Sequence, residues 1–304
     1  MAGRFNGPTR RRHPTSPAGI VSLGPLTRDP MVPRMLLSLA LVCGGIYAAA
    51  CAGLFLGQHR LVYLPERHLD QTPAERGLDY ADQWITTADG VRVHAWYVPG
   101  PEDAPVVLFT HGNAGNISHR LHILELLNRL GAGVLILSYR GYGLSEGSPD
   151  EAGTYSDAQA AYQHLTTTLG IAPQRIVLFG RSLGGGIASW LAANEDCGGL
   201  VLESTFTSIP DMAAHLYPIF PVRMLARIRY DTRSRMSALR CPVLIVHGPA
   251  DEVVPFSHGE TLFRALRGDG DFLRIPGGHN DALMLEDAGY HRAWSRMLER
   301  TQSR

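Results

Sequence analysis

The stretch FGRSLGGG at residues 179–186 places Ser182 between a bulky arginine and a leucine and surrounds them with glycines. An apolar run, RIVLF, precedes it, and the helical pattern IASWLAAN follows it. A G-x-S-x-G pattern at such a junction is typical of a sharp strand-to-helix turn that strains the serine backbone and exposes its hydroxyl. A phosphate-binding loop would need a lysine, but Ile187 follows the glycines and all 28 basic residues are arginine. We therefore interpret Ser182 as a nucleophile, with a structural turn serine as the alternative.

Short apolar segments alternate with longer helical ones along most of the chain. The sequence predicts strands at 106–110, 134–139, 175–180, 199–204, 242–248 and 272–277, and helices at 117–130, 151–169, 183–194, 256–266 and 281–300. Two further strands within 80–100 are joined by a turn at Asp89-Gly90. Most strands lack alternation of polar and apolar residues, as expected where helices cover both faces of a sheet. This order predicts an α/β fold with a mostly parallel, doubly wound sheet. Residues of about 205–239 interrupt it and are expected to form a small cap over the strand ends, where ligands bind.

The N-terminal part of the chain has two sections of different composition. Residues 1–34 are rich in arginine, proline and glycine, and we predict a disordered tail. Residues 35–58 carry no charge and are long enough to cross a hydrocarbon core of about 30 Å as a single transmembrane helix. Arginines before this run favour a cytoplasmic N-terminus, so residues 60–304 would lie on the extracytoplasmic side. The alternatives are a cleaved signal sequence and export, or lipid attachment at Cys51 after cleavage.

A serine nucleophile needs a base, and the base needs an acid that orients it. In sheets of this type the chain order is serine, acid, histidine. Asp251 and His279 each follow an apolar strand, at the end where such residues converge, and we predict that they complete a catalytic triad with Ser182. Glu203, which ends the preceding strand, is the rival acid.

Other polar residues near these strand ends are given structural roles. His247 is interpreted as a packed residue, His258 as part of a helix start, and Asp281 as the cap of the last helix. Arg181 beside the serine receives no role. The four cysteines, Cys43, Cys51, Cys197 and Cys241, form no metal-binding pattern, so we expect no metal.

The oxyanion hole is expected to use two backbone N–H groups. One belongs to Leu183, directly after the serine, and the other to Asn113 in the turn HGNAGN at 111–116. His111 is interpreted as a support of this turn. Asn116 is placed to cap the following helix, and this plain turn is the alternative to an oxyanion loop.

Several of these motifs occur together and in a recognisable order. HGNAGN, YRGYGLSEG, GRSLGGG, HGPADEVVP and GGHND follow one another, with RLVYLPER and an apolar run before them and ESTFTSIPDM at 203–212. This combination resembles the α/β-hydrolase superfamily, and within it the membrane-anchored bud-emergence-suppressor-like subfamily. The resemblance covers residues of about 60–300 and implies Ser182, Asp251 and His279 as the triad. It also implies a serine hydrolase: some relatives cleave fatty-acyl thioesters, and others are labelled serine peptidases.

We expect acyl transfer to water through an acyl-enzyme, on an ester or thioester with a lipid-like acyl group and without a cofactor. The alternatives are an aminopeptidase-like serine peptidase on the same triad and a non-catalytic, membrane-tethered binding protein. The formal net charge of zero gives no indication of nucleic-acid binding, and we expect a monomer. Residues 215–230 mix aromatic, aliphatic and arginine side chains, and we interpret them as an ordinary cap helix. An acyl-pocket lining or a lipid contact is the alternative for that segment.

Overall fold

The computed structural model describes residues 3, 7, 31–280 and 287–302. Its contacts divide the chain into two compact units, residues 1–48 and 49–304. Helix α1 (Met31–Val62) begins in the first unit and ends in the second, and it is long and apolar enough to cross a membrane. It extends four residues beyond the apolar run at each end. Apart from residues 3 and 7, the remainder of the predicted tail lies outside the described residues.

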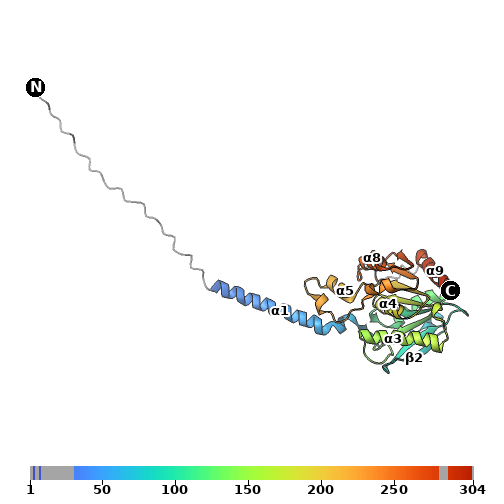
Figure 1. Cartoon of the computed structure of the whole chain (residues 1–304). Coiled ribbons are helices and arrows are strands. Elements are labelled where there is room, and N and C mark those ends of the chain that lie inside the picture. The colour runs from blue at the N-terminus through green and yellow to red at the C-terminus, as the bar shows by residue number, and fades with distance from the viewer. Residues whose placement is uncertain (1–2, 4–6, 8–30, 281–286, 303–304) are drawn as a thin grey trace. The chain divides into compact units, whose positions relative to one another are not determined.

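An eight-stranded sheet forms the centre of the second unit (Figure 1). The order of its strands is β10-β9-β8-β7-β4-β6-β3-β2. Its strands are β2 (Ala81–Thr86), β3 (Arg92–Val98), β4 (Val106–Thr110), β6 (Gly133–Ser138), β7 (Ile176–Arg181), β8 (Gly199–Glu203), β9 (Val243–His247) and β10 (Gly270–Arg274). Strand β3 pairs antiparallel with β2 and β6, and every other pairing in this sheet is parallel. The predicted α/β class with a mostly parallel sheet is confirmed.

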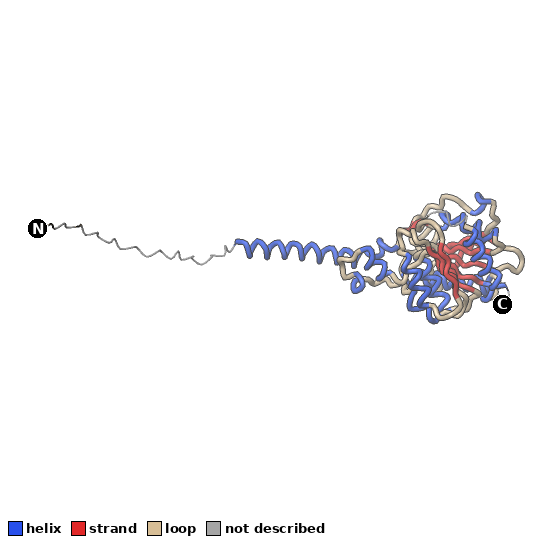
Figure 2. The backbone as a smooth tube through the Cα atoms, turned by 90° about the horizontal axis from the view of Figure 1, so that it is seen from above, coloured by secondary structure: helices blue, strands red, loops and turns tan. Residues whose placement is uncertain are grey.

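Helices cover both faces of this sheet, which explains why its central strands are apolar throughout (Figure 2). The longer helices after α1 are α2 (Leu121–Arg129), α3 (Glu151–Gln163), α4 (Leu183–Asn194), α8 (Phe256–Ala265) and α9 (Ala288–Gln302), and a π-helical turn (His164–Thr168) extends α3. Along β4, Val106 and Leu108 pack in the cluster that holds α3, α4 and α8, whereas Val107 and Phe109 pack with α2 and α9. Successive side chains thus fill two separate cores.

Short elements complete the unit. They are β1 (Leu64–Pro65), which pairs in parallel with β5 (Ala114–Gly115), and the single turns Pro73–Arg76, Ile117–Arg120, Pro173–Arg175 and Met236–Ala238. Residues 205–239, which we call the cap segment, lie between β8 and β9 and form α5 (Ile209–Leu216), α6 (Val222–Leu225) and α7 (Thr232–Arg235). The interpretation of residues 215–230 as one ordinary helix is wrong, because α5 ends at Leu216 and Pro218 and Pro221 precede the next short helix.

The bounds of the last strand and the last helix differ from the expectation. Strand β10 begins two residues earlier than predicted and ends at Arg274. It is the edge strand and only partly buried, so it contains the polar residues Asp271 and Arg274, and its ends cannot be recognised from an apolar run. Helix α9 begins at Ala288. Asp281, predicted to cap that helix, lies outside the described residues.

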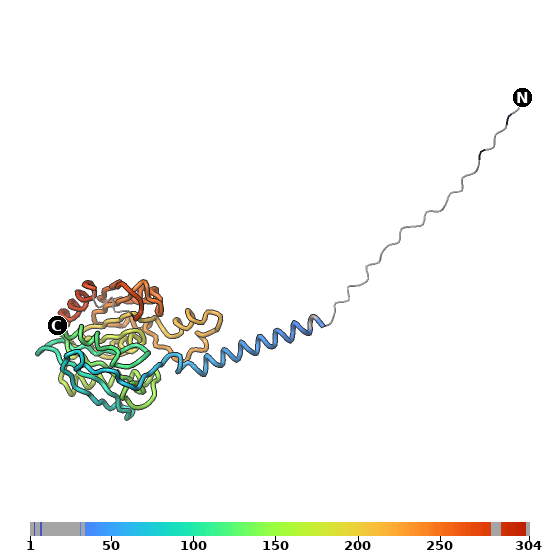
Figure 3. The backbone as a smooth tube through the Cα atoms, turned by 180° about the vertical axis from the view of Figure 1, so that it is seen from behind, coloured from blue at the N-terminus to red at the C-terminus, as the bar shows by residue number. Residues whose placement is uncertain are grey.

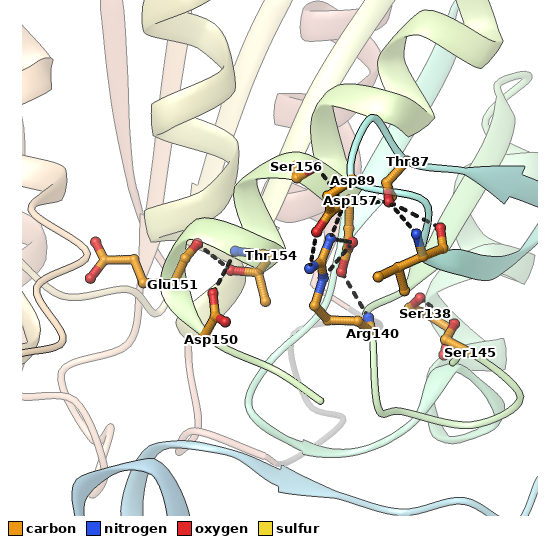
Figure 4. A network of polar contacts seen from close by, with 12 residues as sticks. Thr87, Asp89, Ser138, Arg140, Ser145, Asp150, Glu151, Thr154, Ser156 and Asp157 are labelled. Atoms are coloured by element: carbon orange, nitrogen blue, oxygen red, sulfur yellow. Dashed lines mark hydrogen bonds and ion pairs between the residues drawn. The ribbon is translucent and has the colours of Figure 1, made fainter. Parts of the chain in front are cut away.

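A buried arginine fixes α3 against the sheet (Figure 4). Arg140 follows β6, and its Nε donates to Asp157 Oδ1 of α3 at 2.9 Å while Nη1 donates to Asp89 Oδ2 of the β2–β3 turn at 2.7 Å. At the start of the same helix, the carboxylate of Glu151 accepts the N–H groups of Arg229 and Tyr230 at 2.7 and 2.8 Å. Helix α3 therefore ties the end of the cap segment to the sheet.

Candidate active site

Ser182 stands in the turn between β7 and α4, in the position that the sequence predicts. Its backbone has φ 53° and ψ −119°, a region that residues with side chains rarely adopt. The surrounding backbone holds this conformation: Ser182 N–H donates to the Glu203 carbonyl at 2.9 Å, and the Ser182 carbonyl accepts from Thr205 Oγ1 at 2.6 Å. The turn is thus a rigid elbow.

Two glycines of the elbow are required by close packing. A Cβ on Gly184 would collide with the backbone carbonyl of Thr110 in β4, and a Cβ on Gly180 would collide with the backbone of Gly184. The start of α4 therefore lies directly against β4, and the glycines of FGRSLGGG allow this close approach.

Asp251 and His279 come together beyond the ends of β9 and β10. The His279 ring nitrogen Nδ1 lies 3.0 and 2.9 Å from the two carboxylate oxygens of Asp251, and both side chains are buried. Asp251 Oδ1 also accepts the N–H groups of Val253 and Val254 at 3.0 and 2.8 Å. With Nδ1 held as the donor, the other ring nitrogen, Nε2, is the one able to take a proton.

The charge of Asp251 is stabilised by its surroundings. Burial acts to raise the pKa of this carboxyl, but hydrogen bonding to His247 and His279 and to the Val254 N–H outweighs it, so the pKa lies well below its ordinary value. His247 Nε2 lies 3.4 Å from Asp251 Oδ2 and 2.9 Å from the Val254 carbonyl, within the packed role expected for it. Asp251 is therefore a carboxylate at neutral pH.

Arg181, to which the sequence assigned no role, connects the elbow to the histidine loop. Its Nη2 donates to the His279 carbonyl at 2.5 Å, and its Nε lies 3.0 Å from Glu203 Oε1. Tyr290 donates its hydroxyl to the other oxygen of Glu203 at 2.6 Å, and Glu252 accepts the His279 N–H at 2.9 Å. Both backbone polar groups of His279 are thereby held by charged side chains.

The hydroxyl of Ser182 and the ring of His279 share no hydrogen bond among the contacts of the described residues. Arg181 provides the connection between them, since it precedes the serine in the chain and binds the histidine carbonyl. The carboxylate of Glu203, the rival acid, forms an ion pair with Arg181 and accepts a hydrogen bond from Tyr290. The histidine ring contacts Asp251 instead.

The loop that contains Asn113 is braced on both sides. Asn113 Nδ2 donates to the Val62 carbonyl at 3.2 Å, and the Asn113 carbonyl accepts from Leu64 N–H at 3.1 Å and from the Tyr142 hydroxyl at 2.7 Å. The hydrogen bonds of the described residues include none from the backbone N–H of Asn113 or Leu183. Both residues line the same cavity as Ser182.

The other candidate residues of this region are engaged elsewhere. His111 is fully buried, its Nδ1 lies 2.7 Å from the Gly112 carbonyl, and burial together with the charge of Arg120 lowers its pKa to about 3. Asn116 accepts the Ser118 N–H at 2.9 Å and so caps the following turn. The Nδ1 of His258 accepts the Thr207 N–H at 3.1 Å. These contacts agree with the structural roles expected for them.

An apolar cavity of about 200 Å³ opens beside Ser182. Its lining consists of Leu54, Gln58, Leu61, Val62, Asn113, Ser182, Leu183, Phe206, Ile209, Met212, Ala213, Leu216, Tyr217, Val222, Leu225, Ala226, Val253 and Val254. Much of the wall comes from the cap segment and from the last turns of α1. The side chains within 215–230 thus include pocket-lining residues, which the interpretation as an ordinary solvated helix missed.

One group of residues elsewhere offers metal-ligating atoms. Among the described residues, Glu66, Asp70 and His119 place one ligand atom each within 4.8 Å of one another, but they are only partly buried or exposed. Both ring nitrogens of His119 are already used, by Asp70 Oδ2 at 2.8 Å and by Asn116 N–H at 3.4 Å. The thiol of Cys197 is hydrogen-bonded to Cys241, and this hydrogen bond, followed by burial, raises the pKa of Cys197.

Comparison with known proteins shows similarity to α/β hydrolases. Residues 105–225 match a family model described as the alpha/beta hydrolase fold. The alpha/beta hydrolase domain-containing protein WAV2 of Arabidopsis thaliana is 37% identical over 284 residues, which cover 84% of this chain and 92% of that protein. An uncharacterized membrane protein of Saccharomyces cerevisiae, YNL320W, is 34% identical over 259 residues, covering 80% of this chain and 91% of the relative. Protein bem46 of Schizosaccharomyces pombe is 38% identical over 194 residues, with 60% and 64% of the two chains covered.

Solved structures share the architecture at lower identity. The Pyrococcus furiosus esterase Pf2001 aligns with a TM-score of 0.66 at 18% identity, covering 79% of this chain and 98% of that chain. At this identity the likeness concerns the fold.

Proposed function

Because the chain belongs to the α/β-hydrolase superfamily, in the bem46-like subfamily, we propose that it is a serine hydrolase that cleaves a carboxylic ester or acyl thioester. The observation that carries the proposal is the arrangement of a strained serine elbow next to a buried Asp251–His279 pair. A nucleophile, a base and an orienting acid in this chain order are what acyl transfer to water requires.

In the proposed mechanism, His279 Nε2 takes the proton of Ser182 as its oxygen attacks the substrate carbonyl carbon. Asp251 holds the ring tautomer and stabilises the imidazolium that forms. The N–H groups of Asn113 and Leu183 receive the developing oxyanion. The alcohol or thiol leaves with a proton from His279, and a water activated by His279 then releases the acid and regenerates Ser182.

The character of the cavity favours an ester or thioester over a peptide with a free amino group. An aminopeptidase-like enzyme would be expected to present an acidic side chain to the substrate ammonium. None of the described residues that line the cavity is acidic or basic. In this proposal the cap segment covers the cavity over the strand ends.

We propose for α1 the role of a single-pass anchor with the N-terminus in the cytoplasm. A window of the helix within Arg34–Val62 has a mean hydropathy of 2.1, and a similar yeast protein is named a membrane protein. The arginines of the N-terminal tail support this orientation. The hydrolase unit would then work on the extracytoplasmic side.

A fluorophosphonate probe tests the nucleophile directly, because it reacts with an activated serine. Ser182→Ala in the full-length chain, kept in detergent micelles, should abolish labelling. Ser189→Ala is the matched control: this serine is also buried in α4, its hydroxyl bonds to the Gly186 carbonyl at 3.1 Å, and labelling should persist. Undiminished labelling of folded Ser182→Ala, checked by circular dichroism, would mean that another residue is the nucleophile.

A further inference from the structure

The last turns of α1 form one wall of the cavity next to Ser182. Leu54, Gln58, Leu61 and Val62 all line it. Their spacing of four, three and one residues puts them on a single face of the helix. The transmembrane candidate Arg34–Val62 contains all of them, so the same helix that would anchor the chain also shapes the pocket.

This face of α1 is fastened to the cap segment through one polar side chain. Gln58 Oε1 accepts the N–H groups of Arg227 and Ile228 at 2.6 and 3.3 Å, and its Nε2 donates to the Leu225 carbonyl at 3.3 Å. The guanidinium of Arg227 also lies 5.6 Å from the ring centre of Phe55. Figures 1 and 3 show the yellow-to-orange cap segment beside the end of the blue helix.

The end of the same helix is also fastened to the proposed oxyanion loop. Val62 accepts from the side chain of Asn113, and Leu64, two residues on, donates to the Asn113 carbonyl. The helix end thus contacts both the loop that would bind the oxyanion and the segment that covers the cavity. A ligand in the cavity would lie between them.

The lining specifies the chemistry of that ligand. Of its 18 residues only Gln58, Asn113, Ser182 and Tyr217 carry polar side-chain atoms, and none is charged. Two of these side chains are already occupied, Gln58 with the cap segment and Asn113 with Val62. A volume of about 200 Å³ with such walls suits an unbranched hydrocarbon chain and offers little to a polar group.

We propose that this cavity is an acyl-chain site in which α1 is a specificity wall, so that the substrates are esters or thioesters of medium- to long-chain fatty acids. The inference rests on the proposed serine-hydrolase function. It adds that Leu54 and Leu61 contact the acyl chain while its carbonyl carbon lies at Ser182. Each buried methylene should then raise kcat/KM by about 3- to 4-fold until the cavity is full.

The test fills the cavity from two sides in the full-length chain. Leu54→Trp narrows it from α1, and its matched control is Leu56→Trp, two residues along on the exposed surface of the same helix. Ala213→Trp narrows it from α5, with Ala214→Trp as its control, because only Ala213 lines the cavity. Using both walls keeps the test valid if one variant fails to fold.

The measured quantity is the ratio of kcat/KM for p-nitrophenyl decanoate to that for p-nitrophenyl acetate. The wild type should strongly prefer decanoate, and each lining variant should lower the ratio by about 10-fold or more, since several methylenes lose their contacts. The controls should keep the wild-type ratio. A decanoyl thioester assayed in parallel shows which carbonyl type the enzyme prefers, with the same loss in the lining variants expected for both.

The outcomes separate this inference from the proposed function. If the wild type and the lining variants share one ratio, the cavity does not hold the acyl chain, even though ester hydrolysis and probe labelling continue. If the wild type hydrolyses neither ester and takes up no fluorophosphonate, the serine-hydrolase proposal itself fails. A fall of the ratio in the controls as large as in the lining variants would also overturn the acyl-chain site.

Discussion

At the scale of single residues, the strained conformation of Ser182 is maintained by its neighbours. Its N–H donates to Glu203 at the end of β8, and its carbonyl accepts from Thr205 just after that strand. Its helix can approach β4 only because Gly184 has no side chain. A backbone in such a region costs about 1–3 kcal/mol and persists where the surroundings determine it. The strain of the elbow is therefore compensated by β8 and β4.

The proposed acid, Asp251, gives the first residue-scale prediction. Asp251→Asn should reduce kcat by orders of magnitude, about 10⁴-fold in the serine-protease precedent, because the amide no longer holds the productive tautomer. Glu203→Gln should have a much smaller effect, because Glu203 reaches His279 only through Arg181. Measuring ester hydrolysis by both variants side by side decides whether Asp251 or Glu203 is the acid. A larger loss in Glu203→Gln would make it Glu203.

The same carboxyl also affects stability, with a definite sign. Its pKa is lowered in the folded chain, so its contribution to the free energy of unfolding is complete above the ordinary aspartate pKa of about 3.9. That contribution is lost as the pH falls through the lower pKa of the folded state. Asp251 therefore stays ionised wherever the protein would work near neutral pH.

Sequence order alone was enough to bring Asp251 and His279 together, but it gave no role to Arg181. The three triad candidates follow apolar runs, and parallel strands place their carboxyl ends at one edge. The role of Arg181 depends on strand register, since it pairs with Glu203 across β7 and β8. Register between distant strands is set by packing, which one sequence does not display. The only sign of this ion pair in the sequence is that Arg181 and Glu203 each end an apolar run.

At the scale of secondary-structure elements, the buried strands and α4 were the easiest to predict. Strands β4 and β6 are buried along their whole length, so their apolar runs mark them clearly. The end of α1 was harder, because hydropathy falls at His59 and Arg60 although the helix continues to Val62. Its contacts with the cap segment and the Asn113 loop hold these last turns, and hydropathy does not register such contacts.

Helix α3 gives a stability prediction at this scale. Asp157→Asn should lower the free energy of unfolding by about 3–5 kcal/mol, because it leaves Arg140 buried without its fully buried anionic partner. Asp89→Asn is the matched control. Its carboxylate binds the same arginine but has a side chain 51% exposed, so the loss should be about 1 kcal/mol or less. Urea unfolding of the full-length chain in detergent measures the free energy of unfolding of both variants. Equal losses would contradict the different roles assigned to Asp157 and Asp89.

At the scale of the whole molecule, the proposed orientation is open to direct measurement. With epitopes at both ends, a protease added to the extracytoplasmic side of sealed membrane vesicles should remove the C-terminal epitope and spare the N-terminal one. The reverse pattern would invert the orientation proposed from the arginines. Loss of the N-terminal epitope before any protease is added would indicate that the N-terminal segment is a cleaved signal sequence.

A membrane anchor is commonly treated as an exchangeable module, but under the two proposals made for α1, attachment and substrate choice share the same residues. Leu54 and Gln58 belong to the apolar helix and also line the cavity, and Gln58 bonds to the cap segment. A fragment released by a cut after Gln58 would thus be an open-sided catalyst with altered selectivity. Grafting a foreign anchor onto the catalytic unit would likewise change what it hydrolyses as well as where it resides.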